Sequence, residues 1–175
     1  MARIKRTDPQ AFFQDLVNAI EGLLLQIERG KRALYVLSPF LVERYVHGFI
    51  RFVQRLRRKG LLDDVTVITR HPKYFASTKR DYITRLIEDM RRAGIRVCFG
   101  HDKFHAKVVV IDDSYVIAGS INPLAPSHSE VLYKMPLRKY WKLLIQNPRS
   151  AKAIIRNLVH PLCPQNERLQ ATWPR

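Results

Sequence analysis

The sequence predicts an α/β fold in which a mixed β-sheet is sandwiched between helices. Short runs rich in β-branched residues alternate with longer segments whose apolar residues recur at helical spacing. After the last of these helical segments, a hairpin pattern adds antiparallel strands to the sheet. The 175 residues suit one domain. We place it at residues 1–160, followed by a basic, proline-rich tail at 161–175.

Capping residues mark where the expected helices begin. Asp8 with Pro9 is typical of a helix start, and Thr78 with Asp81 resembles a capping pair. Residues 1–7 carry several charges and are expected to be a loose basic arm. The expected elements are, in order, a helix from Asp8 with a stop at Gly30, a strand at 33–40, a helix at 42–59, a strand at 64–69, a helix at 78–94, a strand at 95–99, a hairpin at 108–118, a strand at 130–135 and two short helices within 136–160.

Residues 104–122 form the hairpin pattern, with two apolar runs on either side of turn-forming residues. A two-residue loop at Asp113 and Ser114 would place Asp112 opposite Tyr115. We take this register as the expectation, because a shift of one residue would send the neighbouring side chains to different faces of the sheet.

In this register four polar side chains converge on one face. Lys107 opposes Ser120, and His105 opposes Asn122, with Cβ atoms roughly 5 Å apart. A lysine charge, an amide and a hydroxyl suit a phosphate, and a neutral imidazole is a nucleophile near pH 7. The alternative is a buried hairpin whose polar residues find partners. Four such groups favour a site, since each costs about 1–3 kcal/mol when it is buried without a partner.

The motif His105-x-Lys107-x4-Asp112, followed after six intervening residues by Gly119-Ser120-x-Asn122, resembles the HKD signature of the phospholipase D superfamily. This resemblance implies an α/β/α sandwich that cleaves phosphodiesters without a metal. It also implies a phosphohistidine on the motif histidine and a second motif histidine that protonates the leaving group. Because the chain has one full motif, the resemblance implies the single-motif branch, which includes bacterial endonucleases and builds its active site across a homodimer.

The resemblance also implies an acidic residue that follows Asn122 and orients the nucleophile. Glu130 is the matching position, and its carboxylate beside Nδ1 of His105 would leave Nε2 free to attack. Asp112 falls at the turn, so we interpret it, together with Gly119, as a structural residue of the motif.

The segment 70–77 follows a strand's carboxyl end, where α/β sheets commonly bind ligands. Arg70, His71 and Lys73 are therefore expected to bind substrate phosphates, and a plain surface loop is the alternative. His47 lies inside an amphipathic helix and is expected to be structural.

A metal site is a competing interpretation. The possible ligands that lie close together in the sequence are His101, Asp102, His105, Asp112 and Asp113. Lys107 would lie beside His105 and repel a cation, so we expect no metal and no other cofactor.

The net charge of +16 favours a polyanionic partner. Nucleic acid, DNA more than RNA, is the first candidate, an anionic lipid surface is the second, and a merely basic surface is the alternative to both. No transmembrane run or secretion signal is apparent. Cys98 and Cys163 form no C-x-x-C pattern, so neither zinc nor a disulfide framework is suggested, and a cytoplasmic location fits.

These observations together predict a metal-independent phosphodiesterase, most simply an endonuclease that acts as a homodimer. A phospholipase D or phosphatidyl transferase is the alternative enzyme. A non-catalytic nucleic-acid-binding protein is the alternative of another class.

Overall fold

The computed structural model describes residues 2–6, 8–28, 32–100, 104–112, 114–119, 122–126 and 130–136. The strands are β1 (Ala2–Arg6), β2 (Ala33–Leu37), β3 (Asp64–Arg70), β4 (Arg96–Gly100), β5 (Val108–Ile111), β6 (Tyr115–Gly119) and β7 (Glu130–Pro136). The helices are α1 (Pro9–Leu24), α2 (Glu43–Arg58), α3 (Ser77–Arg92) and the short 3-10 helix η1 (Pro72–Tyr74).

The strands form one seven-stranded mixed sheet in the order β1-β7-β6-β5-β2-β3-β4. β2, β3 and β4 are parallel neighbours, because α2 and α3 provide the crossover connections between them. The β2–β5, β5–β6, β6–β7 and β1–β7 pairs are antiparallel. The α/β class with a mixed sheet, predicted from the alternating patterns, is confirmed.

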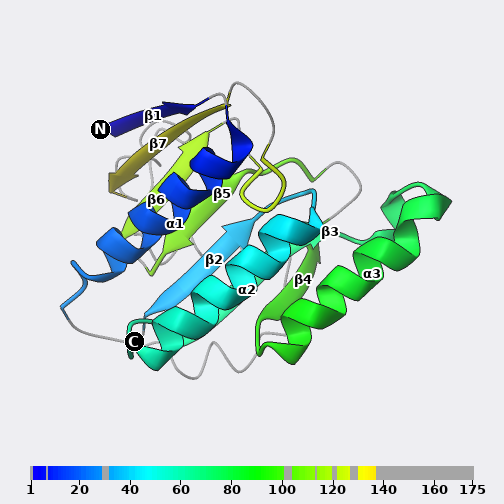
Figure 1. Cartoon of the computed structure of the whole chain (residues 1–175), viewed down its shortest axis with the longest axis horizontal. Helices are drawn as coiled ribbons and strands as arrows, with labels where there is room; N and C mark the ends of the chain where they lie inside the picture. Colours follow the sequence, from blue (N-terminus) through cyan, green and yellow to red (C-terminus); the bar gives the residue numbers. More distant parts are fainter. Residues whose placement is uncertain are drawn as a thin grey trace, which may run out of the picture.

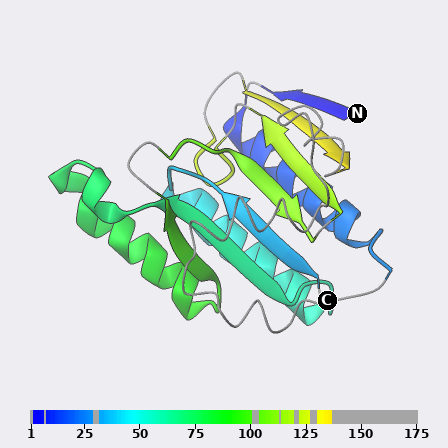
Figure 2. The same ribbon diagram turned by 180° about the vertical axis from the view of Figure 1, so that it is seen from behind.

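All three described α-helices cover the same face of the sheet (Figure 1), and the strands lie in front of them when the molecule is seen from behind (Figure 2). Val36 and Val67 point to this face and join the helices in one hydrophobic core. Tyr35 and Leu37, which point to the other face, are buried as well, although no described helix packs there. The helices predicted within 136–160, and the domain limit at residue 160, lie outside the described residues.

The predicted start of α1 is confirmed. The Asp8 carboxylate accepts hydrogen bonds from the backbone N–H groups of Gln10, at 2.9 Å, and Ala11, at 3.2 Å. The capping pair predicted at Thr78 and Asp81 is wrong. α3 begins at Ser77, before Thr78, and no side chain caps it.

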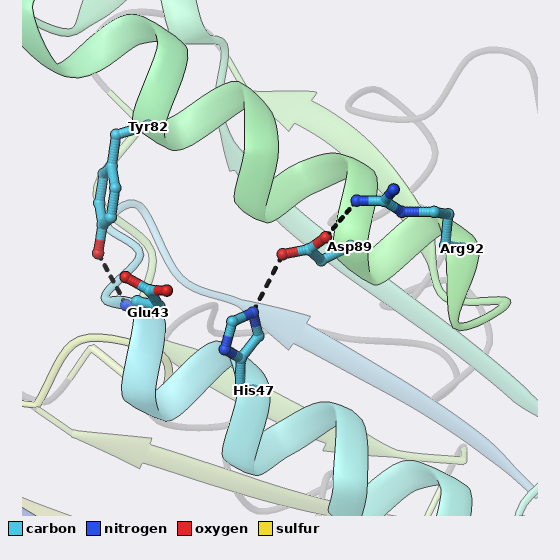
Figure 3. Close-up of polar contacts among 5 residues, drawn as sticks. All are labelled: Glu43, His47, Tyr82, Asp89 and Arg92. Carbon is cyan, nitrogen blue, oxygen red and sulfur yellow. Dashed lines mark hydrogen bonds and ion pairs between the residues drawn. The ribbon is translucent and has the colours of Figure 1, made fainter.

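A row of polar contacts joins α2 to α3 (Figure 3). The hydroxyl of Tyr82 accepts a hydrogen bond from the backbone N–H of Glu43 at 2.9 Å, and Nε2 of His47 lies 3.0 Å from Oδ2 of Asp89. Arg92 donates to the other oxygen of the same carboxylate. The hydrogen bonds from His47 and Arg92 lower the pKa of Asp89. His47 thus has a helix-to-helix contact of the structural kind expected for it. Of the described helices, none has the length and hydrophobicity of a membrane-spanning segment.

The N-terminal residues are a correction to the sequence prediction. Residues 2–6, expected to be a loose arm, form the edge strand β1 and pair with β7 from Ala2 opposite Lys134 to Arg6 opposite Glu130. The free edge of β7 offers backbone donors and acceptors, which a short basic segment can satisfy even though it has little apolar character.

Cys98 is a second correction. It lies in β4, is half-buried, and is disulfide-bonded, a bond that the lack of a disulfide framework in the sequence did not lead us to expect. Cysteine spacing along a sequence does not reveal which thiols meet in space. Cys163, the other cysteine of the chain, lies outside the described residues. Because stable disulfides are typical of oxidising compartments, the cysteines no longer support the cytoplasmic prediction.

Candidate active site

The hairpin has a different register from the predicted one. Ile111 pairs with Tyr115, so the turn contains three residues and the expected Asp112–Tyr115 pairing is wrong. Asp112 has φ +52°, a left-handed conformation that aspartate tolerates better than most residues. Hairpin pairing in this register does not set His105 opposite Asn122. The two residues lie just beyond the paired strands, before β5 and after β6.

The topology nevertheless brings several of the predicted residues to one edge of the sheet. β2, β3 and β6 end at this edge, and β5 and β7 begin there, as their registers require. We call it the site edge. The helices α1, α2 and α3 also begin there, because each follows a strand that ends at the site edge. Helix N-termini carry partial positive charge, so this arrangement favours an anionic ligand.

Arg70, the last residue of β3, holds the ring of His105. Nη2 of Arg70 lies 2.7 Å from Nε2 of His105, and Nε of Arg70 donates to the carbonyl oxygen of Phe104 at 3.0 Å. A guanidinium has donors only, so Nε2 of the imidazole must accept. A neutral ring that accepts at Nε2 carries its proton on Nδ1. The exposed His105 therefore presents the Nε2 lone pair that a nucleophile needs.

Phe40 packs against both of these side chains. Its ring centroid lies 4.8 Å from the guanidinium carbon of Arg70 and 6.2 Å from the ring centroid of His105, which it meets at an interplanar angle of 67°. Phe75 contacts the Phe40 ring at 6.3 Å in an edge-to-face arrangement. Sequence reasoning missed Phe40 as a site residue. Its position at the carboxyl end of the predicted strand was the available signal.

Ser38 fixes the segment that carries Asn122, and sequence reasoning missed it as well. The fully buried Ser38 hydroxyl donates to the carbonyl oxygen of Phe40 at 2.9 Å and accepts from the backbone N–H of Leu124 at 3.1 Å. The carbonyl oxygen of Leu124 accepts from the backbone N–H of Val42 at 2.9 Å. The connection from β2 to α2 therefore holds residues 122–126 against the site edge.

Two buried oxygens at the site edge have no hydrogen-bond partner among the described residues. They are Oγ1 of Thr69, the residue before Arg70, and Oδ1 of Asn122. Folded proteins leave few buried polar atoms unpaired, and the exceptions call for an explanation. The Thr69 hydroxyl can donate to an anionic ligand, whereas Oδ1 of Asn122 only accepts and needs a donor.

The remaining residues of the motif are described to different extents. Lys107 is half-buried and directly precedes β5 at the site edge. Gly119 ends β6 and pairs with Leu132. Glu130 begins β7 at the same edge, but its side chain is outside the described set, as is the whole of Ser120.

Asp112 lies at the opposite end of β5 from His105. β5 has four residues, which at ~3.3 Å each span about 13 Å, too far for both side chains to hold one ion. The backbone N–H of Asp112 donates to the carbonyl oxygen of Ala33 at 2.7 Å. Across the described ranges, no three His, Cys, Asp or Glu side chains gather into a possible metal site. His101, Asp102 and Asp113 lie outside those ranges.

His71 and Lys73 have local partners. Nδ1 of His71 accepts a hydrogen bond from the backbone N–H of Lys73 at 3.1 Å and so caps η1. The His71 ring packs 4.6 Å from that of Phe99, and the Lys73 ammonium lies 5.0 Å from the Tyr74 ring. Of the three residues predicted in this segment, Arg70 is the one in contact with His105. Substrate binding by the other two stays a prediction.

Comparisons with known proteins agree with this architecture. The family model described as "Cardiolipin synthase, PLD-like domain" matches residues 23–131. No curated protein matches the sequence. Among solved structures, NucT from Helicobacter pylori is 15% identical with a TM-score of 0.50, covering 83% of this chain and 96% of that one.

Two larger proteins contain a similar unit. Polyphosphate kinase from Porphyromonas gingivalis is 15% identical with a TM-score of 0.54, covering 85% of this chain and 26% of that one. Phosphatidylserine synthase from Haemophilus influenzae is 15% identical with a TM-score of 0.51, covering 97% of this chain and 46% of that one. At such low identity these similarities concern the fold alone.

Proposed function

Because this chain belongs to the family of phospholipase D-like domains, we propose that it is a metal-independent phosphodiesterase, specifically an endonuclease that hydrolyses nucleic-acid phosphodiester bonds. The contact between Arg70 and His105 carries the proposal. It leaves Nε2 of an exposed imidazole unprotonated and places a permanent positive charge 2.7 Å from it. A nucleophile beside a cation is the pair that attack on an anionic phosphodiester requires.

In the proposed reaction, the Nε2 lone pair of His105 forms a bond to phosphorus as the bond from phosphorus to the leaving oxygen breaks. In the second copy, Arg70 also leaves Nε2 for a phosphoryl oxygen, so His105 there can carry a proton at Nε2, and it gives this proton to the leaving oxygen. Water then attacks phosphorus, the same imidazole takes a proton from it, and the N–P bond breaks. Both histidines return to their starting states.

The other site residues stabilise the charge that develops on the phosphoryl oxygens. Arg70 exchanges Nε2 of His105 for a non-bridging oxygen when substrate binds, which frees the lone pair. Lys107 and Asn122 bind the other oxygens, and Ser120 supports them. Each of these is a donor at the place where negative charge grows.

Glu130 is proposed to orient His105 by accepting the Nδ1 proton. A ring that accepts from Arg70 at Nε2 carries its proton at Nδ1, which is the position a carboxylate would bind. The start of β7 at the site edge is compatible with this role.

The nucleic-acid substrate is inferred from charge. A net charge of +16 concentrates polyanions at the surface, and DNA is the first candidate. The homodimer follows from chemistry, since the chain has one motif histidine and the reaction needs a nucleophile and an acid. The exposure of His105 leaves it accessible to a second copy.

A phosphatidyl transferase is the second candidate, because the matching family model carries the name cardiolipin synthase. An enzyme that acts on lipid needs an apolar surface for the acyl chains. The large apolar side chains exposed among the described residues are Leu25, Val42 and Tyr74, which are far apart in the sequence and form no continuous helical stripe. Nucleic acid is therefore the preferred substrate class.

The proposal is tested by comparing wild type with His105→Ala on supercoiled plasmid DNA and on short-chain phosphatidylcholine. We expect plasmid nicking by wild type, in EDTA, with inhibition by tungstate or vanadate, and no nicking by His105→Ala. A denaturing quench at alkaline pH during turnover should trap the phosphohistidine, because its N–P bond is stable in alkali and hydrolyses in acid. Light scattering of the purified protein should give the mass of a dimer.

Three results would contradict the proposal in different ways. Activity that is lost in EDTA and restored by a divalent ion would exclude the metal-independent mechanism. Turnover of phosphatidylcholine without plasmid nicking would favour the lipid enzyme. Salt-sensitive DNA binding by wild type with no turnover of either substrate would favour a non-catalytic binding protein.

A further inference from the structure

A second positively charged feature lies away from His105, between α1 and α2. The two helices lie side by side on the same face of the sheet (Figure 1) and border a groove of about 400 Å³. Gln10 and Gln14 of α1 line one wall, and no acidic residue is among the lining residues described. The other wall, on α2, carries Arg44, Arg51, Arg55 and Arg58. We call this feature the arginine groove.

The arginines form a row because of their spacing. From Arg44 to Arg58 the steps are four, three, four and three residues, with Gly48 as the second member, so all five positions share one face of α2. At ~1.5 Å per residue the row is about 21 Å long. A Cβ atom at Gly48 would lie 2.9 Å from Cε1 of Phe13. The glycine therefore lets the two helices approach and keeps the middle of the row free of a side chain.

Most of this charge is not neutralised by the protein. Arg55 pairs with Glu21 at 2.9 Å, and Arg44 lies over the ring of Tyr45 at 4.6 Å. Arg51 and Arg58 are exposed and pair with no carboxylate in the part of the chain described. Like charges three and four residues apart destabilise a helix. A row of this kind costs stability in the free protein, and an anionic ligand would relieve that cost.

The arginine groove leads toward the catalytic residues. α1 and α2 both begin at the site edge, so Gln10 and Arg44 mark the end of the groove nearest to it. The start of α2 is tied to the segment that carries Asn122 by the hydrogen bond from the Val42 N–H to the Leu124 carbonyl oxygen. A ligand that follows the groove would therefore arrive beside the proposed active site.

The lining side chains favour a phosphodiester backbone over a lipid surface. The aromatic residues Phe13, Tyr45 and Phe52 in the groove are buried, at most 8% exposed, and none of the exposed large apolar residues that the structure describes lines it. The groove has no apolar group to insert into a membrane and no exposed ring on which a base could stack. What it offers is arginines for phosphates and amides for hydrogen bonds.

We propose that the arginine groove binds the backbone of one nucleic-acid strand, independent of sequence, and guides it to the site edge. Packed helices lie about 8–10 Å apart, which suits one strand rather than a duplex. At ~3.4 Å per nucleotide, the 21 Å row would cover roughly six nucleotides. The inference rests on the proposed function for its choice of ligand, but it concerns binding and does not require that the bound strand be cleaved.

The test compares Arg51→Glu/Arg58→Glu with a matched control, Lys79→Glu/Arg85→Glu, which makes the same charge change at exposed positions of α3. Fluorescence anisotropy of labelled single-stranded DNA, 20 nucleotides of thymidine, measures affinity across a salt series. The full chain with His105→Ala serves as background, so that cleavage cannot deplete the probe. We expect the groove variant to bind at least tenfold more weakly and its salt dependence to fall by about 1.4, since each lost phosphate contact contributes ~0.7 on a single strand. The control should change affinity less than threefold.

Equal weakening by both variants would overturn the proposal, because binding would then depend on total charge alone. It would also fail if the groove variant kept its DNA affinity but no longer bound vesicles of phosphatidylglycerol and phosphatidylcholine. Arg51→Gln/Arg58→Gln, with circular dichroism of each protein, guards against a folding defect and should give an intermediate loss. Groove-dependent binding together with an inactive wild type would reject the nuclease function and keep this inference.

Discussion

Replacing Arg70 with alanine removes three interactions at the site edge. The guanidinium contacts Nε2 of His105 at 2.7 Å, donates to the carbonyl oxygen of Phe104 at 3.0 Å and lies 4.8 Å from the ring of Phe40. A hydrogen bond contributes about 1 kcal/mol net, and an exposed cation–π contact about 0.5–1 kcal/mol. Because Arg70 is only half-buried, we expect Arg70→Ala to lower the free energy of unfolding by about 1–2 kcal/mol.

The larger expected effect is on catalysis. If Arg70 moves from His105 to a phosphoryl oxygen in the transition state, its loss removes one preorganised donor. Donors of this kind contribute about 10²–10³ to kcat, or roughly 3–4 kcal/mol. Arg70→Lys keeps the charge but loses the planar fork that serves two acceptors, so we expect a smaller loss of about tenfold.

The assay measures kcat and KM on bis(p-nitrophenyl) phosphate at neutral pH, and urea unfolding of the same samples. Arg85→Ala is the control, because it removes an exposed arginine of α3 without touching the site edge. We expect the control to match wild type in both measurements. A wild-type kcat for folded Arg70→Ala would refute the assignment of Arg70 to the transition state. An unchanged unfolding free energy would refute the structural part.

Three further predictions concern stability. The hydrogen bonds that lower the pKa of Asp89 stabilise the fold above the usual carboxyl value of 3.8, and this contribution is lost as pH falls through the lowered value. Wild type should therefore resist urea better than Asp89→Asn at neutral pH, with the difference vanishing once the pH falls below the lowered pKa of Asp89. Gly60 and Gly94 both have positive φ, but a Cβ would meet nothing within 4 Å at Gly60 and would lie 3.0 Å from Nη1 of Arg57 at Gly94. Thermal melts should show a loss of about 1 kcal/mol for Gly60→Ala and a larger one for Gly94→Ala, and the reverse order would contradict this packing. Ser38→Ala leaves a buried backbone N–H without its acceptor, which should cost about 1–3 kcal/mol in urea unfolding and lower kcat. An unchanged kcat would show that the segment held by Ser38 needs no such support.

Local patterns were sufficient for much of the fold. The limits of α2 fall within a residue of the predicted 42–59, because apolar periodicity and a terminal glycine are properties of the segment itself. The strands at 64–70 and 108–111 were equally recognisable. Errors appeared where a partner far along the chain decides the outcome. β1 exists because β7 offers it an edge, and no feature of its own five residues predicts that pairing.

The sequence by itself determined which residue types are available for the proposed chemistry, since a histidine, a lysine and an asparagine at fixed spacing already suit a phosphate. The tertiary structure decided how they meet. Asp112 adopts a left-handed conformation, and the hairpin register is shifted by one residue from the predicted one, so strand pairing does not set His105 opposite Asn122. Both residues lie instead along the edge of the sheet that β2, β3, β5 and β6 share. Only packing shows that Arg70, thirty-five residues before His105, holds its reactive nitrogen. Such contacts depend on the order of the strands in the sheet. That order is set by burial across the whole chain, and no local sequence signal determines it.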